Sequence, residues 1–249
     1  MGPIPKSHPR YLSLLTREKI AEMMRKGVVH ESGLIAHGRG EAFDYLLGEQ
    51  TIPPADQAEQ VAAAALLIAV NPVVSVNGNV AALASEECVR LAEIVPAKLE
   101  VNLFHRSQDR VEKVVEELRE KGAKMVLGSL TDAIIPGLDH DRALCTRDGI
   151  FSADVVLVPL EDGDRCQALR HMGKLVVAID LNPLSRTAKT ASITIVDNVT
   201  RALPRIRYWV DVLRKIRPAD LETLVKRWNN EKNLRDVIAF LSKRLNALF

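Results

Sequence analysis

The segment from Asp180 to Thr187 gathers several groups that can hold a polar ligand. Asp180 and Asn182 offer oxygen and amide groups, and Arg186 offers a forked cationic donor. Such groups bind hydroxyl, carboxylate and phosphate oxygens through directional hydrogen bonds. The segment directly follows the apolar run from Leu175 to Ile179, which we interpret as a strand. We therefore predict a ligand-binding loop at the end of that strand.

Polar clusters follow other apolar runs of the chain in the same way. They are Asn77-Gly78-Asn79, Phe104-His105-Arg106, Glu161 to Arg165, and Asp197-Asn198. A single cluster could be a turn only, because Asn, Asp and Gly favour tight turns. Their repetition indicates ligand binding, because parallel strands bring their carboxyl ends to one edge of a sheet, where ligands bind. Together with the Asp180 loop, the cluster at Asp197-Asn198 predicts half of a nucleotide cleft.

Two of these clusters are suited to an anion. Asn77-Gly78-Asn79 precedes a predicted helix, whose free N–H groups can hold a phosphate, although an Asx-type helix cap is the simpler alternative. Arg106, beside His105, could donate to phosphate or carboxylate oxygens, or could be an ordinary surface arginine.

Two further segments contain residues that could do chemistry. The stretch from His30 to Gly48 is rich in glycine and basic residues, namely Gly33, His37, Gly38, Arg39 and Gly40. It predicts either a flexible loop that closes over an anion or a sharp turn. The run from Asp139 to Arg142 looks like a metal cluster, but consecutive residues rarely converge on one ion. We expect a substrate or capping role there, and no metal ligands.

Standard catalytic fingerprints are missing from the sequence. There is no GxxxxGK[ST] phosphate loop, no complete GxGxxG and no GxSxG motif. The usual NTPase, dinucleotide and serine-hydrolase arrangements are therefore not indicated.

Six short apolar runs predict the strands that must position these clusters. They are Val73 to Val76, Leu99 to Leu103, Met125 to Leu127, Val155 to Val158, Leu175 to Ile179 and Ile193 to Val196. Helical patterns lie between them at Val80 to Ile94, Gln108 to Lys121 and Arg165 to Met172. Apolar strands that alternate with helices indicate an α/β protein with a mostly parallel, Rossmann-like sheet flanked by helices.

Helical additions are expected at both ends of this core. Ser7-His8-Pro9 can start a helix that runs to Gly27, or two short helices that meet near Thr16, and a buried helix is expected from Ala55 to Val70. Three helical patterns follow Arg201, with breaks at Arg217-Pro218 and Asn229-Asn230. We predict one structural domain with an N-terminal helical segment and Gly-rich loop (1–72), a Rossmann-like core (73–203) and a helical appendage (204–249).

Composition narrows the class of protein further. With 47% hydrophobic and 27% charged residues in 249, the chain has ordinary globular values. Its 34 basic and 32 acidic residues give a net charge of +2, too small to indicate nucleic acid. Three cysteines without CxxC spacing fit a reducing compartment, and no apolar stretch is long enough for a bilayer. We expect a cytoplasmic protein with neither nucleic-acid nor membrane partners.

Several long motifs of the chain resemble one known family. They are Ser7-His8-Pro9-Arg10-Tyr11, His37-Gly38-Arg39-Gly40-Glu41-Ala42, Val76-Asn77-Gly78-Asn79-Val80, Asn102-Leu103-Phe104-His105-Arg106, Ala178 to Thr187 and Val196 to Ala202. The chain resembles the archaeal 4-phosphopantoate:β-alanine ligase family, also called phosphopantothenate synthetase. The match runs from about Ile4 to Arg207, and the tail after it is less diagnostic.

This resemblance implies an amide synthesis in coenzyme A biosynthesis. 4-Phosphopantoate and β-alanine would give 4′-phosphopantothenate, with ATP converted to AMP and pyrophosphate through an acyl adenylate. A homodimer and Mg²⁺ are expected as well. The ATP contacts that the resemblance implies are Arg17, Arg39, Asp180, Leu181, Asn182, Arg186, Thr187, Asn198 and Val199. It leaves Asn77, Gly78, Asn79, His105 and Arg106 to the acid substrate, and His37, His105 and His140 as candidates for accepting the amine's proton.

Two other functional classes stay open at this point. A Rossmann-like NAD(P)-dependent oxidoreductase would share the sheet and the strand-end site, although the missing third glycine counts against it. A non-catalytic nucleotide-binding protein would bind ATP without turnover.

Overall fold

The computed structural model describes residues 4–8 and 10–247 of the chain. The elements in chain order are α1 (Tyr11–Arg25), α2 (Glu31–Leu47), α3 (Pro53–Ile68), β1 (Pro72–Val76), α4 (Gly78–Ile94), β2 (Lys98–Val101), α5 (Gln108–Glu120), β3 (Val126–Leu127), β4 (Ala133–Ile134), β5 (Leu144–Cys145), β6 (Val155–Pro159), α6 (Gly163–His171), β7 (Leu175–Ile179), α7 (Arg186–Thr190), β8 (Ile193–Ile195), α8 (Val199–Leu213), α9 (Pro218–Lys226) and α10 (Asn230–Asn246). Of the predicted helix start at Ser7-His8-Pro9, Pro9 lies outside the described residues.

The centre of the fold is a six-stranded sheet in the order β3-β2-β1-β6-β7-β8. Every neighbouring pair in it is parallel. The chain builds outward from β1 to β3, then returns across the sheet and builds outward from β6 to β8. This is the doubly wound order of Rossmann-type proteins, and it creates a crevice between β1 and β6 where the direction of winding reverses. The predicted α/β fold class is confirmed.

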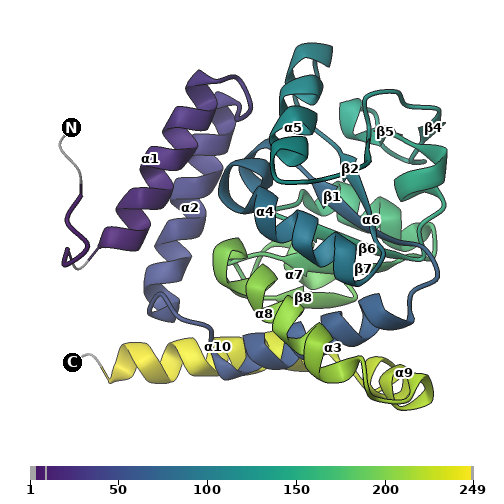
Figure 1. The fold of residues 1–249 in the computed structure, drawn as a ribbon. Coiled ribbons are helices and arrows are strands. Elements are labelled where there is room, and N and C mark those ends of the chain that lie inside the picture. The colour runs from purple at the N-terminus through teal and green to yellow at the C-terminus, as the bar shows by residue number, and fades with distance from the viewer. Residues whose placement is uncertain (1–3, 9, 248–249) are drawn as a thin grey trace.

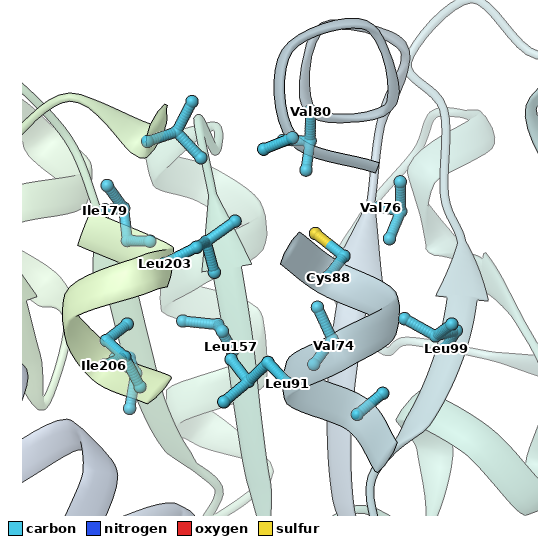
Figure 2. Packing of buried hydrophobic residues seen from close by; sticks show 14 of the residues in the cluster. Val74, Val76, Val80, Cys88, Leu91, Leu99, Leu157, Ile179, Leu203 and Ile206 are labelled. Carbon is cyan, nitrogen blue, oxygen red and sulfur yellow. The ribbon is translucent and has the colours of Figure 1, made fainter. Parts of the chain in front are cut away.

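Helices cover both faces of the sheet (Figure 1). Alternate strand residues belong to two different hydrophobic clusters. Val74, Leu99 and Leu157 belong to the larger cluster, under α4 and α8, as Figure 2 shows. Their neighbours Val73 and Val156 belong to the smaller cluster on the opposite face, with α6. Because both faces are buried, the strands are mostly apolar, and for that reason they were recognisable in the sequence.

The segment from His30 to Gly48 is helical, so the predicted flexible Gly-rich loop is wrong. It forms α2, which lies beside α1 at one side of the sheet (Figure 1). One of its glycines, Gly33, serves close packing. A Cβ atom on Gly33 would lie 2.3 Å from Oδ1 of Asn79 on α4, a distance that no side chain tolerates.

The flanking helices mostly follow the sequence prediction. The first helix is single and continues through Thr16. The breaks expected at Arg217-Pro218 and Asn229-Asn230 separate α8, α9 and α10. Helix α8 runs across the domain boundary that we predicted at 203/204, so that boundary coincides with no element end.

The sequence analysis did not predict strands β4 and β5, which pair antiparallel in a small separate sheet.

No helix among the described residues is both long enough and apolar enough to cross a bilayer.

Candidate active site

Two adjoining pockets lie over the carboxyl ends of the strands. The first, of about 290 Å³, lies over the ends of β1 and β2, and the second, of about 510 Å³, over those of β6 and β7. Ala36, Arg39, Leu160 and Asp162 line both pockets. The pair therefore occupies the crevice at which an open α/β sheet binds its ligands.

Asn77 and Leu160 fix the crevice where β1 and β6 meet. The side chain of Asn77 donates to the carbonyls of Pro159 and Leu160 at 3.1 and 3.0 Å, and its oxygen accepts from the N–H of Val80. Leu160 has φ 54°, in the left-handed region that a leucine rarely adopts. Strained backbone of this kind concentrates at functional sites. The structure thus gives Asn77 the capping role that we had weighed as the simpler alternative.

The first pocket is formed where the N-termini of two helices meet. Asn79 on α4 donates to the carbonyl of Gly33 on α2 at 2.8 Å. Gly78 lets the two segments approach, because a Cβ there would lie 2.4 Å from the carbonyl oxygen of Val28. Helix N-termini carry partial positive charge, which favours an anion in the space between them.

Three further basic residues line this first pocket: His30, Arg110 and Arg142. Arg142 ends the run from Asp139 for which we expected a substrate or capping role, whereas the sequence analysis gave Arg110 no role. Arg110 lies four residues after Arg106, in the first turn of α5. It donates to the carbonyls of His105 and Val28, and burial lowers the pKa of its guanidinium. The pocket is consequently more cationic than the strand-end clusters alone suggested.

His30 and His105 form a stacked pair at the same pocket. Their ring centroids are 3.8 Å apart, and the ring planes differ by 24°. Nδ1 of His30 accepts the N–H of Ser32 at 3.2 Å and thereby caps α2. Burial, with His105 and Arg110 nearby, lowers the pKa of His30. Because Nδ1 accepts the hydrogen bond from Ser32, the neutral form of the ring carries its proton on Nε2.

Arg142 reaches the pocket from a buried ionic network. Its side chain is 4% exposed and pairs with Glu161 at 2.8 Å and with Asp162. Glu161 also pairs with Arg165, whose side chain is fully buried. Nε of Arg142 donates to Asn102 at 3.1 Å. Two carboxylates, Glu161 and Asp162, face two guanidinium groups, and Glu161 is shared between them, so the network is neutral overall and fixes the residues between the two pockets in one arrangement.

The second pocket contains most of the implied ATP contacts. Arg39, Asp180, Leu181, Asn182, Arg186 and Thr187 all line it. The loop is shaped by its own short-range bonds, since Asp180 accepts from the Ser185 hydroxyl and from the N–H of Asn182 at 2.9 Å. Burial raises the pKa of Asp180, against these hydrogen bonds and the nearby Arg39. The loop is preformed for a ligand.

Arg39 is the cation that the two pockets share. It projects from α2 on the same side as Ala36 and Gly40. His37 lies on another side of this helix and lines neither pocket, and burial lowers its pKa. Among the proton-acceptor candidates, His105 alone lines a pocket. His140 instead contacts Asp164 through Nε2 at 3.0 Å.

Four other predicted contacts lie away from both pocket linings. Arg17 bonds Glu41 between α1 and α2. Arg106 donates to the carbonyl of Gly128 at 2.6 Å. Asn198 caps α8 and donates to Asp44, while Val199 is buried. The structure therefore groups the Asp180 loop with Arg39 but leaves Arg17, Arg106, Asn198 and Val199 outside.

Carboxylates at the crevice are too scattered to form a metal cage. No group of three or more His, Cys, Asp or Glu side chains converges among residues 4–8 and 10–247. Asp162, 44% exposed, lines both pockets and offers one carboxylate oxygen to a cation that a ligand brings with it. This donor set suits Mg²⁺ held chiefly by phosphates, its usual mode of binding.

Comparisons with known proteins agree with this geometry. Residues 54–244 match the family model described as Phosphopantothenate/pantothenate synthetase. Proteins named 4-phosphopantoate--beta-alanine ligase are similar along their length. That of Thermococcus onnurineus is 53% identical over 249 residues, covering 100% of this chain and 95% of the relative. That of Methanosarcina mazei is 52% identical over 248 residues, covering 100% and 98%. The chain belongs to the phosphopantothenate/pantothenate synthetase family.

Proposed function

We propose that this chain is an ATP-dependent ligase that joins 4-phosphopantoate to β-alanine and forms 4′-phosphopantothenate for coenzyme A biosynthesis. The observation that carries the proposal is the pair of adjoining pockets, one cationic and one lined by the preformed Asp180 loop. The named relatives support the same substrates. They do not support the oxidoreductase or the non-catalytic alternative.

The two pockets divide the ligands between them in this proposal. ATP occupies the larger pocket, with Asp180 and Asn182 at the nucleoside and Arg186 and Thr187 at the phosphates. 4-Phosphopantoate occupies the first pocket, beside Asn79 and His105. Arg39 lies where the carboxylate meets the α-phosphate. Arg17, Arg106, Asn198 and Val199 can contribute only if the segments that carry them move or a second subunit adds to the site.

The chemistry proceeds in two displacements. A carboxylate oxygen of 4-phosphopantoate attacks the α-phosphorus of ATP, and the bond to the β-phosphate oxygen breaks, which releases pyrophosphate. The amine of β-alanine then attacks the acyl carbon, AMP leaves, and the nitrogen loses a proton. The protein holds the reacting atoms in place and balances phosphate charge. A phosphate oxygen of the departing AMP or a water molecule can take this proton.

Mg²⁺ and a second subunit belong to this proposal as well. Mg²⁺ would arrive with the triphosphate, take one oxygen of Asp162 and neutralise charge on the phosphates. The homodimer and the cytoplasmic location remain predictions from the sequence. Light scattering of the purified chain tests the first of them, and a monomer at assay concentrations contradicts it.

A product assay tests the proposed function. Purified protein is incubated with ATP, Mg²⁺, 4-phosphopantoate and β-alanine, and AMP, pyrophosphate and 4′-phosphopantothenate are quantified. We expect equal amounts of the three products. Omission of the acid should abolish all three, and omission of the amine should abolish AMP and 4′-phosphopantothenate. ATP binding without product in the complete mixture contradicts the proposal.

A further inference from the structure

One corner of the first pocket carries positive charge that no carboxylate of the described chain neutralises through a hydrogen bond. His30 comes from the start of α2, and His105 and Arg110 come from the stretch where β2 leads into α5; the three line this corner together. The guanidinium of Arg110 bonds only the carbonyls of His105 and Val28, and its Nε is buried without a partner. Arg142, in contrast, has its charge balanced by Glu161 and Asp162. The guanidinium of Arg110 therefore favours an anionic ligand at this corner of the pocket.

The histidine stack strengthens this preference. The two stacked imidazoles, 3.8 Å apart, bring their ring N–H groups to one place, where they can donate to an anion together. His30 uses Nδ1 for the helix cap, which leaves its Nε2–H as a donor. The N-termini of α2 and α4 add partial positive charge to the same space. All of these groups favour a compact dianion.

We infer that His30, His105 and Arg110 bind the phosphomonoester of the acid substrate, the group that the reaction leaves unchanged. The inference rests on the proposed function and deepens it, because it assigns the residues that distinguish a phosphorylated acid from its unphosphorylated counterpart. Arg110 donates to the phosphate oxygens, and the stacked pair supplies further donors. A remote phosphate held in this way anchors the acid while its carboxylate reaches toward Arg39.

The phosphates of ATP are the other chemical source of an anion here. The acid is favoured because its pocket, of about 290 Å³, is the smaller of the two, and the neighbouring pocket of about 510 Å³ already contains the Asp180 loop and Arg186. Arg39 and Leu160 lie between them. The assignment to the acid predicts that ATP binding does not depend on Arg110.

Phosphorus NMR separates the two sources, because the phosphomonoester resonance is resolved from the three resonances of ATP. Each ligand is titrated separately with the wild-type chain, Arg110→Gln and His30→Asn. Asparagine is a good helix N-cap, so His30→Asn keeps the start of α2 while it removes the ring. Arg119→Gln is the matched control, since this exposed arginine lies on the same helix, α5, near its other end.

We expect Arg110→Gln to raise the dissociation constant of 4-phosphopantoate by about tenfold to hundredfold, the range for one charge-assisted hydrogen bond. His30→Asn is expected to raise it by about fivefold, since a neutral donor is lost. Both variants, and Arg119→Gln, should bind ATP as the wild type does. Circular dichroism and thermal melting check that each variant is folded.

Three results overturn the inference. Unchanged 4-phosphopantoate binding in folded Arg110→Gln and His30→Asn removes the corner from the acid site. Weakened ATP binding with normal acid binding assigns it to the phosphates of ATP. An equal loss of 4-phosphopantoate affinity in Arg119→Gln would show that the effect comes from the net charge of the protein and not from this corner. A wild-type chain that binds both ligands but makes no product contradicts the proposed function instead and leaves the subsite intact.

Discussion

The two pockets of the crevice are built in different ways. Helix α2 and the segment after β6 line the second, but its polar wall is one loop in which Asp180, Asn182 and Ser185 bond one another within six residues. The polar corner of the first is assembled from two distant segments, with His30 before α2 and with His105 and Arg110 where β2 leads into α5. A loop with such internal bonds is shaped in large part by its local sequence. An assembled pocket depends on how the helices pack, so the two should respond differently to mutation.

The largest effect is expected where the two pockets meet. Arg39→Ala removes the cation that both share, so kcat/KM should fall by about a thousandfold, as for the loss of one preorganised charge at a transition state. The Michaelis constants of ATP and 4-phosphopantoate should both rise. Arg25→Ala, at an exposed position of α1, is the control. A defect confined to one ligand would show that Arg39 belongs to a single pocket.

Arg186→Ala tests the second pocket by itself. Of the two pockets, Arg186 lines only this one, and its guanidinium donates to the side-chain oxygen of Gln167 at 2.6 Å. Its removal should weaken ATP binding by about tenfold to hundredfold and leave 4-phosphopantoate binding unchanged. Equilibrium titration of each ligand measures the difference. Normal ATP affinity and turnover in this variant would remove the assignment of the Asp180 loop to ATP.

Gly33→Ala tests whether helix packing holds the first pocket. The new Cβ would meet Oδ1 of Asn79 at 2.3 Å and force α2 away from α4. We expect a stability loss of about 1–3 kcal/mol and a greater loss of affinity for 4-phosphopantoate than for ATP. Gly38→Ala, on the same helix with nothing within 4 Å, should stabilise the protein by up to about 1 kcal/mol. Equal melting temperatures for the two variants would contradict this packing argument.

The smallest effect on either ligand is expected for Glu59, which lines neither pocket. Its carboxyl group is fully buried without a hydrogen-bond partner, and burial, with Asp197 and Asp56 nearby, raises its pKa to about 9. Below pH 4.5 the group is protonated in both states; between 4.5 and about 9 only the unfolded chain ionises. The free energy of unfolding therefore falls as pH rises, by at most about 1.4 kcal/mol per unit.

Glu59→Gln should remove this pH dependence without changing turnover. Urea unfolding at pH 5 and pH 8 measures it, and the variant should gain stability relative to the wild type at the higher pH. A constant difference between the two proteins across that range would show that Glu59 ionises normally.

The same contrast explains what could be predicted from the sequence. The strands were recognisable because burial on both faces makes them mostly apolar, as at Val155 to Val158. β4 and β5 were missed because each has only two residues and no helical pattern leads into them, whereas the equally short β3 follows the helical pattern from Gln108 to Lys121. Helix α2 was mistaken for a loop because glycine disfavours helices. Its Gly33 instead serves contact with Asn79, which only the tertiary structure reveals.

The site residues also differ in whether the sequence could predict them. Asp180 and Arg186 directly follow a strand, so strand-end reasoning found them. Arg110 lies inside a helix, so strand-end reasoning did not find it. That reasoning selected Arg106, four residues earlier, whose side chain donates to the carbonyl of Gly128. The N-cap at Ser107 was the available signal, because it sets the phase of α5 and brings Arg110 to the pocket.

The central claim is that the two pockets hold ATP and the acid so that the carboxylate attacks the α-phosphorus. Incubation of the protein with ATP, Mg²⁺ and 4-phosphopantoate, without β-alanine, followed by mass spectrometry, tests this most directly. The account predicts a phosphopantoyl adenylate and pyrophosphate, with the adenylate consumed when β-alanine is added. Formation of ADP in place of pyrophosphate would contradict it, because the acid would then have attacked the terminal phosphate.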